Sequence, residues 1–265
     1  MIDIGAFDHY FLAIFGLIGT VLGAAGLLWL THHSRYAAWL HSYRGVAPNF
    51  LSVIGVLFAL NLVFLANDTW HAHDLALDAV FKEAGALRII VALSDNLPTP
   101  IRSKVEHSVR NYARLATITE WPLLAERRSS LEATAELDNL LGNLASEAVG
   151  AALGSSVHTL ILQQVVQVRI LRDLRVALSQ THVNPLKWLG MAFLGLLMMV
   201  SLVMVHIDQP KPEFLAILLF AAAAAPTASI VLVQGNPFQQ PTAVTYEPIA
   251  AMAIYPGLAD SRSPK

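Results

Sequence analysis

The side chains best suited to chemistry lie close together around residue 70. They are Asp68, His71, His73, Asp74 and Asp78. His71 and Asp74 are three residues apart and Asp74 and Asp78 are four apart, so on a helix these three could share one side and hold a divalent cation. His73 points to a different side, so the two histidines are no chelating pair. We predict a solvated polar collar without a bound metal, and keep His71, Asp74 and Asp78 as the alternative metal ligands.

Signatures of catalysis are missing from the rest of the chain. The sequence has no Gly-rich phosphate loop, no His-Glu-x-x-His motif and no nucleophile elbow. Ser155 and Ser156 near His158 are too generic to indicate a hydrolase. The chain has no cysteine, which removes disulfides, thiolate metal sites and cysteine nucleophiles. We predict a protein that is not an enzyme and needs no cofactor.

Four apolar runs without Asp, Glu, Lys or Arg decide the class of protein. They are residues 10–30, 50–66, 188–205 and 214–233. Each is about as long as the roughly 20 residues that a helix needs to cross the hydrocarbon core of a membrane. A charged fraction of only 14% and a mean hydropathy of +0.54 agree with a membrane protein. The net charge of −2 argues against nucleic acid as a partner, which requires a concentrated basic surface.

The apolar runs are grouped two and two around a long charged insert, which predicts an all-α membrane protein with four transmembrane helices. We expect an N-terminal transmembrane hairpin (1–66), a cytosolic helical module inserted between helices 2 and 3 (67–187), a C-terminal hairpin (188–234) and a cytosolic tail (235–265). The insert has a strong helical period and almost no strand signals. Four spans place both termini and the insert on one side, and the basic residues near the membrane slightly favour the cytoplasm for it.

Four glycines recur on one side of the first span. They are Gly16, Gly19, Gly23 and Gly26, at spacings of three, four and three. Small residues on one face let the backbone of another helix approach closely. We predict that this side packs against another helix. The alternative is a chance pattern, since glycine is frequent in membrane helices.

One side of the second span has the composition of a pore lining. The residues within about 100° of one another on a helical wheel are Ile54, Leu57, Asn61, Phe64, Asp68 and His71. Apolar rings at the middle of a membrane can gate ions by dewetting. We predict that the first four line a pore and that Asp68 and His71 form a selectivity or gating collar. In the alternative interpretation Asn61 bonds to a neighbouring helix and Asp68 only ends the span.

Several short motifs occur in an order that is typical of a known membrane family. They are Phe58 to Leu62 followed by Asn67-Asp68-Thr69-Trp70, Ala79-Val80 with Glu83-Ala84 and Leu87, Tyr112 followed by Glu120-Trp121-Pro122, and Asn236-Pro237-Phe238 with Val244 and Glu247-Pro248. In these motifs the chain resembles the bestrophin-like membrane family of bacteria. Gln240 departs from the pattern, because glycine is usual there. The resemblance extends from Asn61 to Pro248.

The resemblance implies two membrane helices, a cytosolic helical module and two further membrane helices, with both termini inside. The related bestrophins are pentameric anion channels with a pore lined by the second membrane helix. The resemblance therefore implies a homo-oligomeric ion channel of the bacterial inner membrane. Its partners would be the lipid bilayer, copies of itself, as a pentamer, and small inorganic ions.

The sign of the permeating ion stays open at this point. The resemblance favours an anion such as chloride, whereas a ring of Asp68 carboxylates would favour cations. Asp68 could instead be neutralised by a basic partner, for which Arg169, Arg172 and Arg175 are the candidates. Two other functions remain as alternatives: a membrane-anchored interaction or sensor module without a pore, and a metal-ion transporter that uses the three alternative metal ligands.

Overall fold

The fold is known from a computed structural model, which describes residues 8–36, 39, 42, 47–180 and 185–254. The described residues are helical, with turns between the helices and no strand. By their contacts they divide into two compact units. The first comprises 1–71 and 182–235, and the second comprises 72–181 and 236–265.

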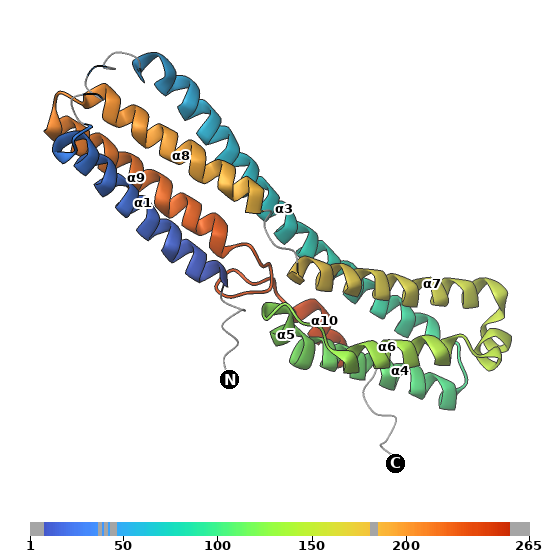
Figure 1. The fold of residues 1–265 in the computed structure, drawn as a ribbon. Helices are drawn as coiled ribbons and strands as arrows, with labels where there is room; N and C mark the ends of the chain where they lie inside the picture. Colours follow the sequence, from blue (N-terminus) through green and yellow to red (C-terminus); the bar gives the residue numbers. More distant parts are fainter. Residues whose placement is uncertain (1–7, 37–38, 40–41, 43–46, 181–184, 255–265) are drawn as a thin grey trace. The chain divides into compact units, whose positions relative to one another are not determined.

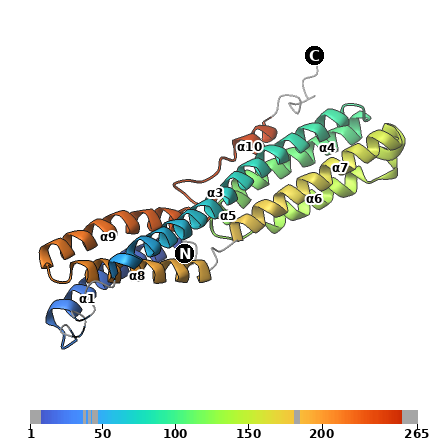
Figure 2. The same cartoon turned by 90° about the horizontal axis from the view of Figure 1, so that it is seen from above.

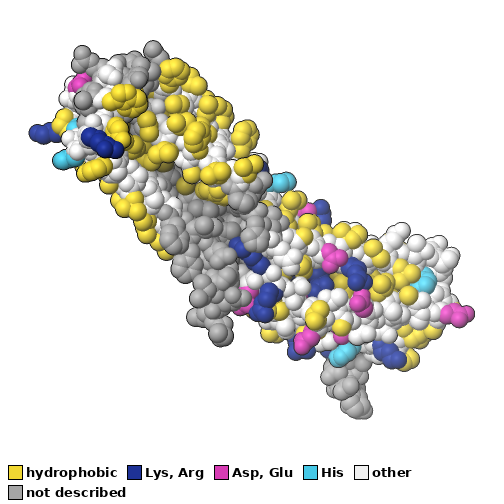
Figure 3. All heavy atoms as spheres, in the orientation of Figure 1, with side chains coloured by type: hydrophobic (Ala, Val, Ile, Leu, Met, Phe, Trp, Pro, Cys, Tyr) yellow, Lys and Arg dark blue, Asp and Glu magenta, His cyan; other side chains and the backbone are white. Residues whose placement is uncertain are grey.

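The first unit contains the most apolar helices of the chain. These are α1 (Asp8–His33), the N-terminal part of α3 (Ala47–Ser94), α8 (Pro185–His206) and α9 (Pro210–Val233). In this unit α1 contacts both α8 and α9, and α8 contacts α9 (Figure 1). On the face drawn in Figure 3, hydrophobic side chains dominate the described surface of this unit. Such a surface requires lipid or another protein to cover it.

Four helical stretches among the described residues are long and apolar enough to cross a membrane, as judged by length and composition alone. They are Phe50–Ser94, Leu186–His206, Pro210–Val231 and Glu147–Gln180. The first three contain or largely overlap the expected spans at 50–66, 188–205 and 214–233. The remaining expected span, 10–30, falls in α1, where part of the side chains lies outside the described residues.

The apolar stretch in α7 (Glu147–Gln180) was expected in the water-facing module. It meets the criterion because residues 148–168 include no Asp, Glu, Lys or Arg. Its inner side, with Ile161 and Val165, is buried in the core of the second unit. Its C-terminal turns carry buried arginines. The packing therefore assigns α7 to the helical module.

The second unit is a bundle around one apolar core. It contains the C-terminal part of α3, α4 (Thr99–Arg114), a π-helical turn η2 (Leu115–Glu120), α5 (Trp121–Ala125), α6 (Leu131–Leu144), α7 and α10 (Glu247–Ala253). In this unit α4 packs on α6 and α10, and α6 packs on α7 (Figure 2). Val80, Leu87, Val109, Leu140 and Val165 are among the fully buried core side chains.

Local sequence signals explain where these helices begin and change. Pro100 lies in the first turn of α4, where its missing N–H costs nothing. The Oγ of Ser130 accepts from the N–H of Ala133 at 3.3 Å and so caps α6. Pro122 does not end the helix outright, because the π-helical turn leads directly into α5. Gly154, at φ 74° and ψ 161°, interrupts α7.

By its contacts, the C-terminal segment from Asn236 onward groups with the second unit. The side-chain N–H of Asn236 donates to the carbonyls of Leu124 and Ala125 at 3.1 and 3.2 Å, which caps the end of α5. The ring of Phe238 meets the edge of Trp121 at a centroid distance of 5.3 Å. Residues 255–265 lie outside the described residues. The Asn236-Pro237-Phe238 motif thus packs against α5, which begins within the Glu120-Trp121-Pro122 motif.

Candidate functional site

One side of α3 is buried inside the first unit. Leu65 and Ala66 are buried there together with residues of α8 and α9. The ring of Phe58 lies 5.4 Å from that of Phe220 on α9. Gly195 of α8 lets the Phe58 ring approach, since a Cβ at Gly195 would lie 3.4 Å from it. These contacts define which side of α3 faces its own protomer.

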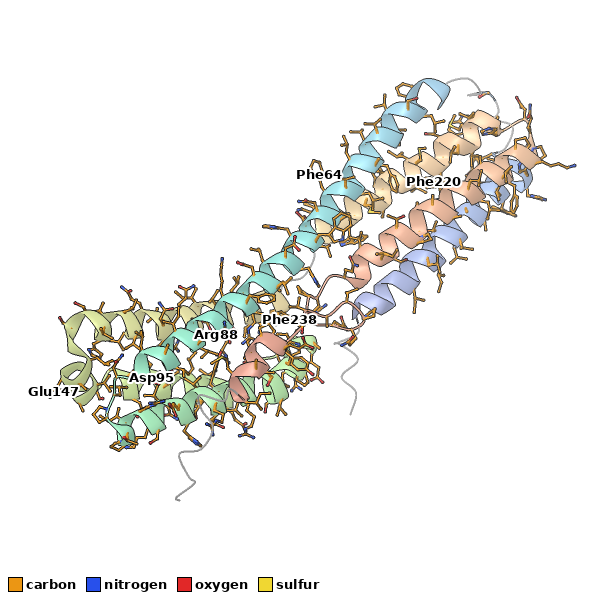
Figure 4. All side chains as sticks on the ribbon, turned by 180° about the vertical axis from the view of Figure 1, so that it is seen from behind. Phe64, Arg88, Asp95, Glu147, Phe220 and Phe238 are labelled. Carbon is orange, nitrogen blue, oxygen red and sulfur yellow. The ribbon has the colours of Figure 1, made fainter. Side chains whose placement is uncertain are left out.

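The opposite side of α3 is open. Leu57 is 49% exposed and Phe64 is 63% exposed, and the Phe64 side chain points away from α8 (Figure 4). Ile54 and Asn61 are half-buried at the margin of this open side. A Cβ added at Gly190 of α8 would lie 3.7 Å from the Nδ2 of Asn61. The structure therefore places Leu57 and Phe64 on the open side of α3, with Ile54 and Asn61 along its border.

Asp68 ends this open side and pairs with Lys187 in the first turns of α8. This corrects the expected partners. Arg169 pairs with Asp138, and Arg172 and Arg175 pair with glutamates of the second unit. The basic partner comes from the start of the third membrane helix, which sequence reasoning did not consider.

The other polar residues around position 70 do not form one cluster. His71 is exposed. The indole N–H of Trp70 donates to Gln234 at 3.2 Å, and Asp78 pairs with Lys82 at 2.6 Å. Within the described part of the chain, no three His, Asp or Glu side chains come together as a metal would require. The geometry thus gives His71, Asp74 and Asp78 no support as a metal site.

The glycine side of α1 is largely unused within the protomer. A Cβ added at Gly16, Gly19 or Gly26 would meet nothing within 4 Å, whereas one at Gly23 would lie 3.6 Å from the Met199 Cε. α1 therefore packs on α8 and α9 mainly through other residues. Its glycine side stays available to a second protein chain.

A buried charge cluster lies in the second unit. The Nε of Arg175 donates to Glu83 at 2.6 Å and its Nη2 donates to the other carboxylate oxygen at 2.9 Å. Tyr112 donates its hydroxyl to the same Glu83 at 2.7 Å. All three side chains are fully buried. This bidentate pair gives both carboxylate oxygens of Glu83 a donor, while the buried Nη1 of Arg175 has no hydrogen-bond partner among the described residues.

A second ion pair lies next to the first. Arg172 donates from Nε to Glu120 at 3.1 Å, and from Nη2 to the carbonyl of Ser130 at 2.9 Å. The N–H of Ser130 donates back to Glu120 at 3.1 Å. Glu120 is the last residue of the π-helical turn η2, and its Oε2 also lies 3.6 Å from Arg175. Two carboxylates and two guanidinium groups therefore balance one another inside the module.

Burial and neighbouring charges raise the pKa values of Tyr112 and Arg175 in this cluster. Burial and then the charge of Glu83 raise the pKa of Tyr112 well above its usual range. Burial opposes the charged form of Arg175, but Glu83, Tyr112 and Glu120 together outweigh it, so the pKa of Arg175 is raised. The guanidinium of Arg175 lies 5.3 Å from the Trp121 ring centroid. The raised pKa values keep the Tyr112 hydroxyl protonated and the Arg175 guanidinium charged at neutral pH, which fits a structural role for the cluster.

The cluster brings together motif residues that are far apart in the sequence. Glu83 bonds to Tyr112 and Arg175, and Glu120 bonds to Arg172 and lies near Arg175. The Trp121 ring lies against the same Arg175. Sequence reasoning identified these residues as motif positions but missed Arg172 and Arg175 as their partners. One signal in the sequence could have found these partners. Arg172 and Arg175 are three residues apart, so they share one side of a helix with buried apolar neighbours, and buried arginines require carboxylates.

The family model of the Bestrophin-like domain matches residues 18–249. The chain belongs to the bestrophin-like family. No curated protein matches this bestrophin-like chain in sequence.

Solved structures share the fold of this bestrophin-like chain. A bacterial bestrophin homologue from Klebsiella pneumoniae superposes with a TM-score of 0.67 at 15% identity, covering 93% of this chain and 97% of the homologue. Another structure of that homologue gives 0.65 at 17%, with 92% and 96% covered. A structure described as a membrane protein gives 0.68 at 14%, with 93% and 97% covered. The family and the all-helical membrane fold predicted from the sequence are confirmed.

Proposed function

We propose that this protein is a homo-oligomeric ion channel of the bacterial inner membrane. It conducts small ions passively through a central pore and catalyses no covalent reaction. α3 lines the pore with Leu57 and Phe64, bordered by Ile54 and Asn61. Asp68 and His71 stand at its end as the selectivity or gating collar.

The observation that carries this proposal is the open side of α3. Leu57 and Phe64 are large apolar residues that the described protomer leaves 49% and 63% exposed. No charged residue lies between Ala47 and Asn67, so this stretch of the helix suits a membrane interior. A ring of such side chains makes a narrow apolar constriction, which passes or stops ions by wetting and dewetting.

A closed ring of subunits follows from the same observation. One protomer offers one pore-facing helix, and a single helix cannot enclose a path for ions. Rotational symmetry repeats the open side of α3 around an axis, and in a closed ring every subunit makes the same contacts with its two neighbours. Membership in the bestrophin-like family favours five copies. The glycine side of α1, open at Gly16, Gly19 and Gly26, supplies a surface for close contact between subunits.

The proposal also includes an orientation. Four membrane helices place the second unit and both termini on one side, and family membership makes that side the cytoplasm. Lys82 and Lys187, which lie close to the membrane on this side, agree with the excess of basic residues in cytoplasmic segments.

The experiment that tests the channel compares Phe64→Ala with Phe193→Ala in liposomes. Phe193 is a similarly exposed phenylalanine, 58% against 63%, but it lies on α8. We expect Phe64→Ala to widen the constriction and raise ion leak severalfold, because the dewetting barrier depends on the ring of apolar side chains. Phe193→Ala should conduct like the wild type. Equal conductance in all three proteins would contradict the pore assignment.

A second function has one observation in its favour. α7 exposes Leu160 and Val166 on a stretch without Asp, Glu, Lys or Arg, which is unusual for a water-facing helix. The exposed Ile170 follows directly after Arg169. A membrane-anchored interaction module would use such a surface to bind a partner. A purified protein that remains a monomer and shows no flux would favour this alternative. A symmetric oligomer with flux would favour the channel.

A further inference from the structure

We propose that the ion pair between Asp68 and Lys187 forms a charge-balanced collar, and that this balance decides how the protein discriminates between cations and anions. The inference rests on the proposed channel function. It assigns Lys187, a residue outside the family motifs of the sequence, as a second determinant of ion selectivity. Asp68 alone would make a ring of carboxylates, which favours cations.

Asp68 lies on the same side of α3 as the proposed constriction. Leu57, Asn61, Phe64 and Asp68 follow one another at spacings of four, three and four, so they fall within about 60° on the helix. Asp68 is about 6 Å farther along the axis than Phe64. Its side chain is 49% exposed. An ion that passes the Phe64 constriction would therefore meet the Asp68 carboxylate directly.

Lys187 comes to this carboxylate from another helix. It is the third residue of α8, and its Nζ bonds to the Oδ2 of Asp68. The lysine side chain is 47% exposed, almost the same as its partner. Neither charge is buried, so both act on an ion nearby. The two opposite unit charges lie at one point along the path and largely cancel beyond their own separation.

Toward the membrane, other fixed charges are far from this pair along the two helices that form it. α3 has no Asp, Glu, Lys or Arg from Ala47 to Asn67, and α8 has none from Trp188 to His206. The nearest titratable residue on α3 is His71, one turn beyond Asp68. The pair is thus the first charged feature that an ion meets after the apolar stretch. With one pair per subunit, the collar carries both signs in equal number around the axis.

The test uses the full-length protein in liposomes under a potassium chloride gradient, with Lys187→Gln, Asp68→Asn and the double variant beside the wild type. Lys187→Gln leaves carboxylates and should raise the potassium-to-chloride permeability ratio by about tenfold, because several like charges act together. Asp68→Asn leaves ammonium groups and should lower the ratio to a similar extent. The double variant should return close to the wild-type ratio, since its collar is again balanced.

Lys211→Gln is the matched control, because Lys211 belongs to the first turn of α9, which follows the other end of α8. It should leave the ratio unchanged. Flux with the same ratio in all variants would overturn the collar and leave the channel intact. A double variant that keeps the shift of one single variant would also overturn it, because the other charge would then have no effect on the ratio. No flux from the wild type would overturn the channel, and the collar with it.

Discussion

Arg175 and Glu83 form a fully buried ion pair, with the Nε of Arg175 2.6 Å from the Oε2 of Glu83. Arg175 comes from α7 and Glu83 from α3, 92 residues earlier in the chain. Tyr112 and Trp121 complete the surroundings of the two charges. Such a pair stabilises the fold only while both partners are present, because either charge alone would be stranded in an apolar interior.

Arg175→Gln should destabilise the helical module strongly. It leaves Glu83 buried without its cation, and breaking a buried pair costs about 3–5 kcal/mol. Arg169→Gln is the control, since Arg169 pairs with Asp138 at the surface, where a pair contributes about 1 kcal/mol or less. Thermal unfolding in detergent, followed by tryptophan fluorescence, measures both. Equal midpoints for the two variants would show that the buried pair adds no stability.

Tyr112→Phe should change how stability depends on alkaline pH. The pKa of Tyr112 is raised in the folded protein, so above about pH 10 the unfolded chain loses this proton while the folded protein keeps it. Stability from Tyr112 is therefore full below pH 10 and falls as pH rises toward the folded pKa. In Tyr112→Phe this part of the fall should disappear.

The same variant should also be less stable at neutral pH. It removes a hydrogen bond to a charged group, which is typically worth about 1.5–3 kcal/mol. Unfolding midpoints measured from pH 8 to 11 test both effects, with the wild type as the reference. A wild type and a Tyr112→Phe variant with parallel pH curves would refute the raised pKa.

Gly150→Ala should weaken the contact between α6 and α7. A Cβ at Gly150 would lie 3.0 Å from the Nδ1 of His158, whose Nε2 lies 2.8 Å from the carbonyl of Leu144 at the end of α6. Displacing this imidazole should cost about 1 kcal/mol, the usual value of one hydrogen bond. Gly142→Ala in α6 meets nothing within 4 Å and should stabilise by about 0.5–1 kcal/mol. Opposite shifts in unfolding midpoint are the expected result, and shifts of the same sign would contradict it.

Glu213→Gln should loosen the contact between α1 and α9. The buried Glu213 carboxylate accepts from the Thr31 hydroxyl at 3.0 Å and lies 2.8 Å from the Nε2 of His32. Losing the charged acceptor should cost about 1–3 kcal/mol. His32→Gln should show a loss in the same direction, while His33→Gln, which points to a different side of α1 from His32, should not. Thermal unfolding in detergent compares the three, and an equal loss in His33→Gln would indicate a nonspecific effect at this helix end.

Local patterns in the sequence were sufficient for the class of protein and for most helices. The membrane spans at 50–66, 188–205 and 214–233 could be predicted from their length and their lack of charge alone, because transfer of a helix into hydrocarbon depends on its composition. Leu57, Asn61, Phe64 and Asp68 are four, three and four residues apart, and helix geometry alone is sufficient to place them on one side of the helix. The motifs at Glu83, Glu120 and Phe238 sufficed for the family, which the comparisons confirm.

The partners of the charged residues depended on the tertiary structure. Asp68 finds Lys187 at a separation of 119 residues, and Glu120 finds Arg172 at a separation of 52. The sequence determined that Asp68 ends an apolar helix and that acids and arginines occur in the insert. Only the packing of helices decided which cation meets which carboxylate, because a charge pair requires a distance of a few ångströms and helical periodicity specifies neighbours only within one helix.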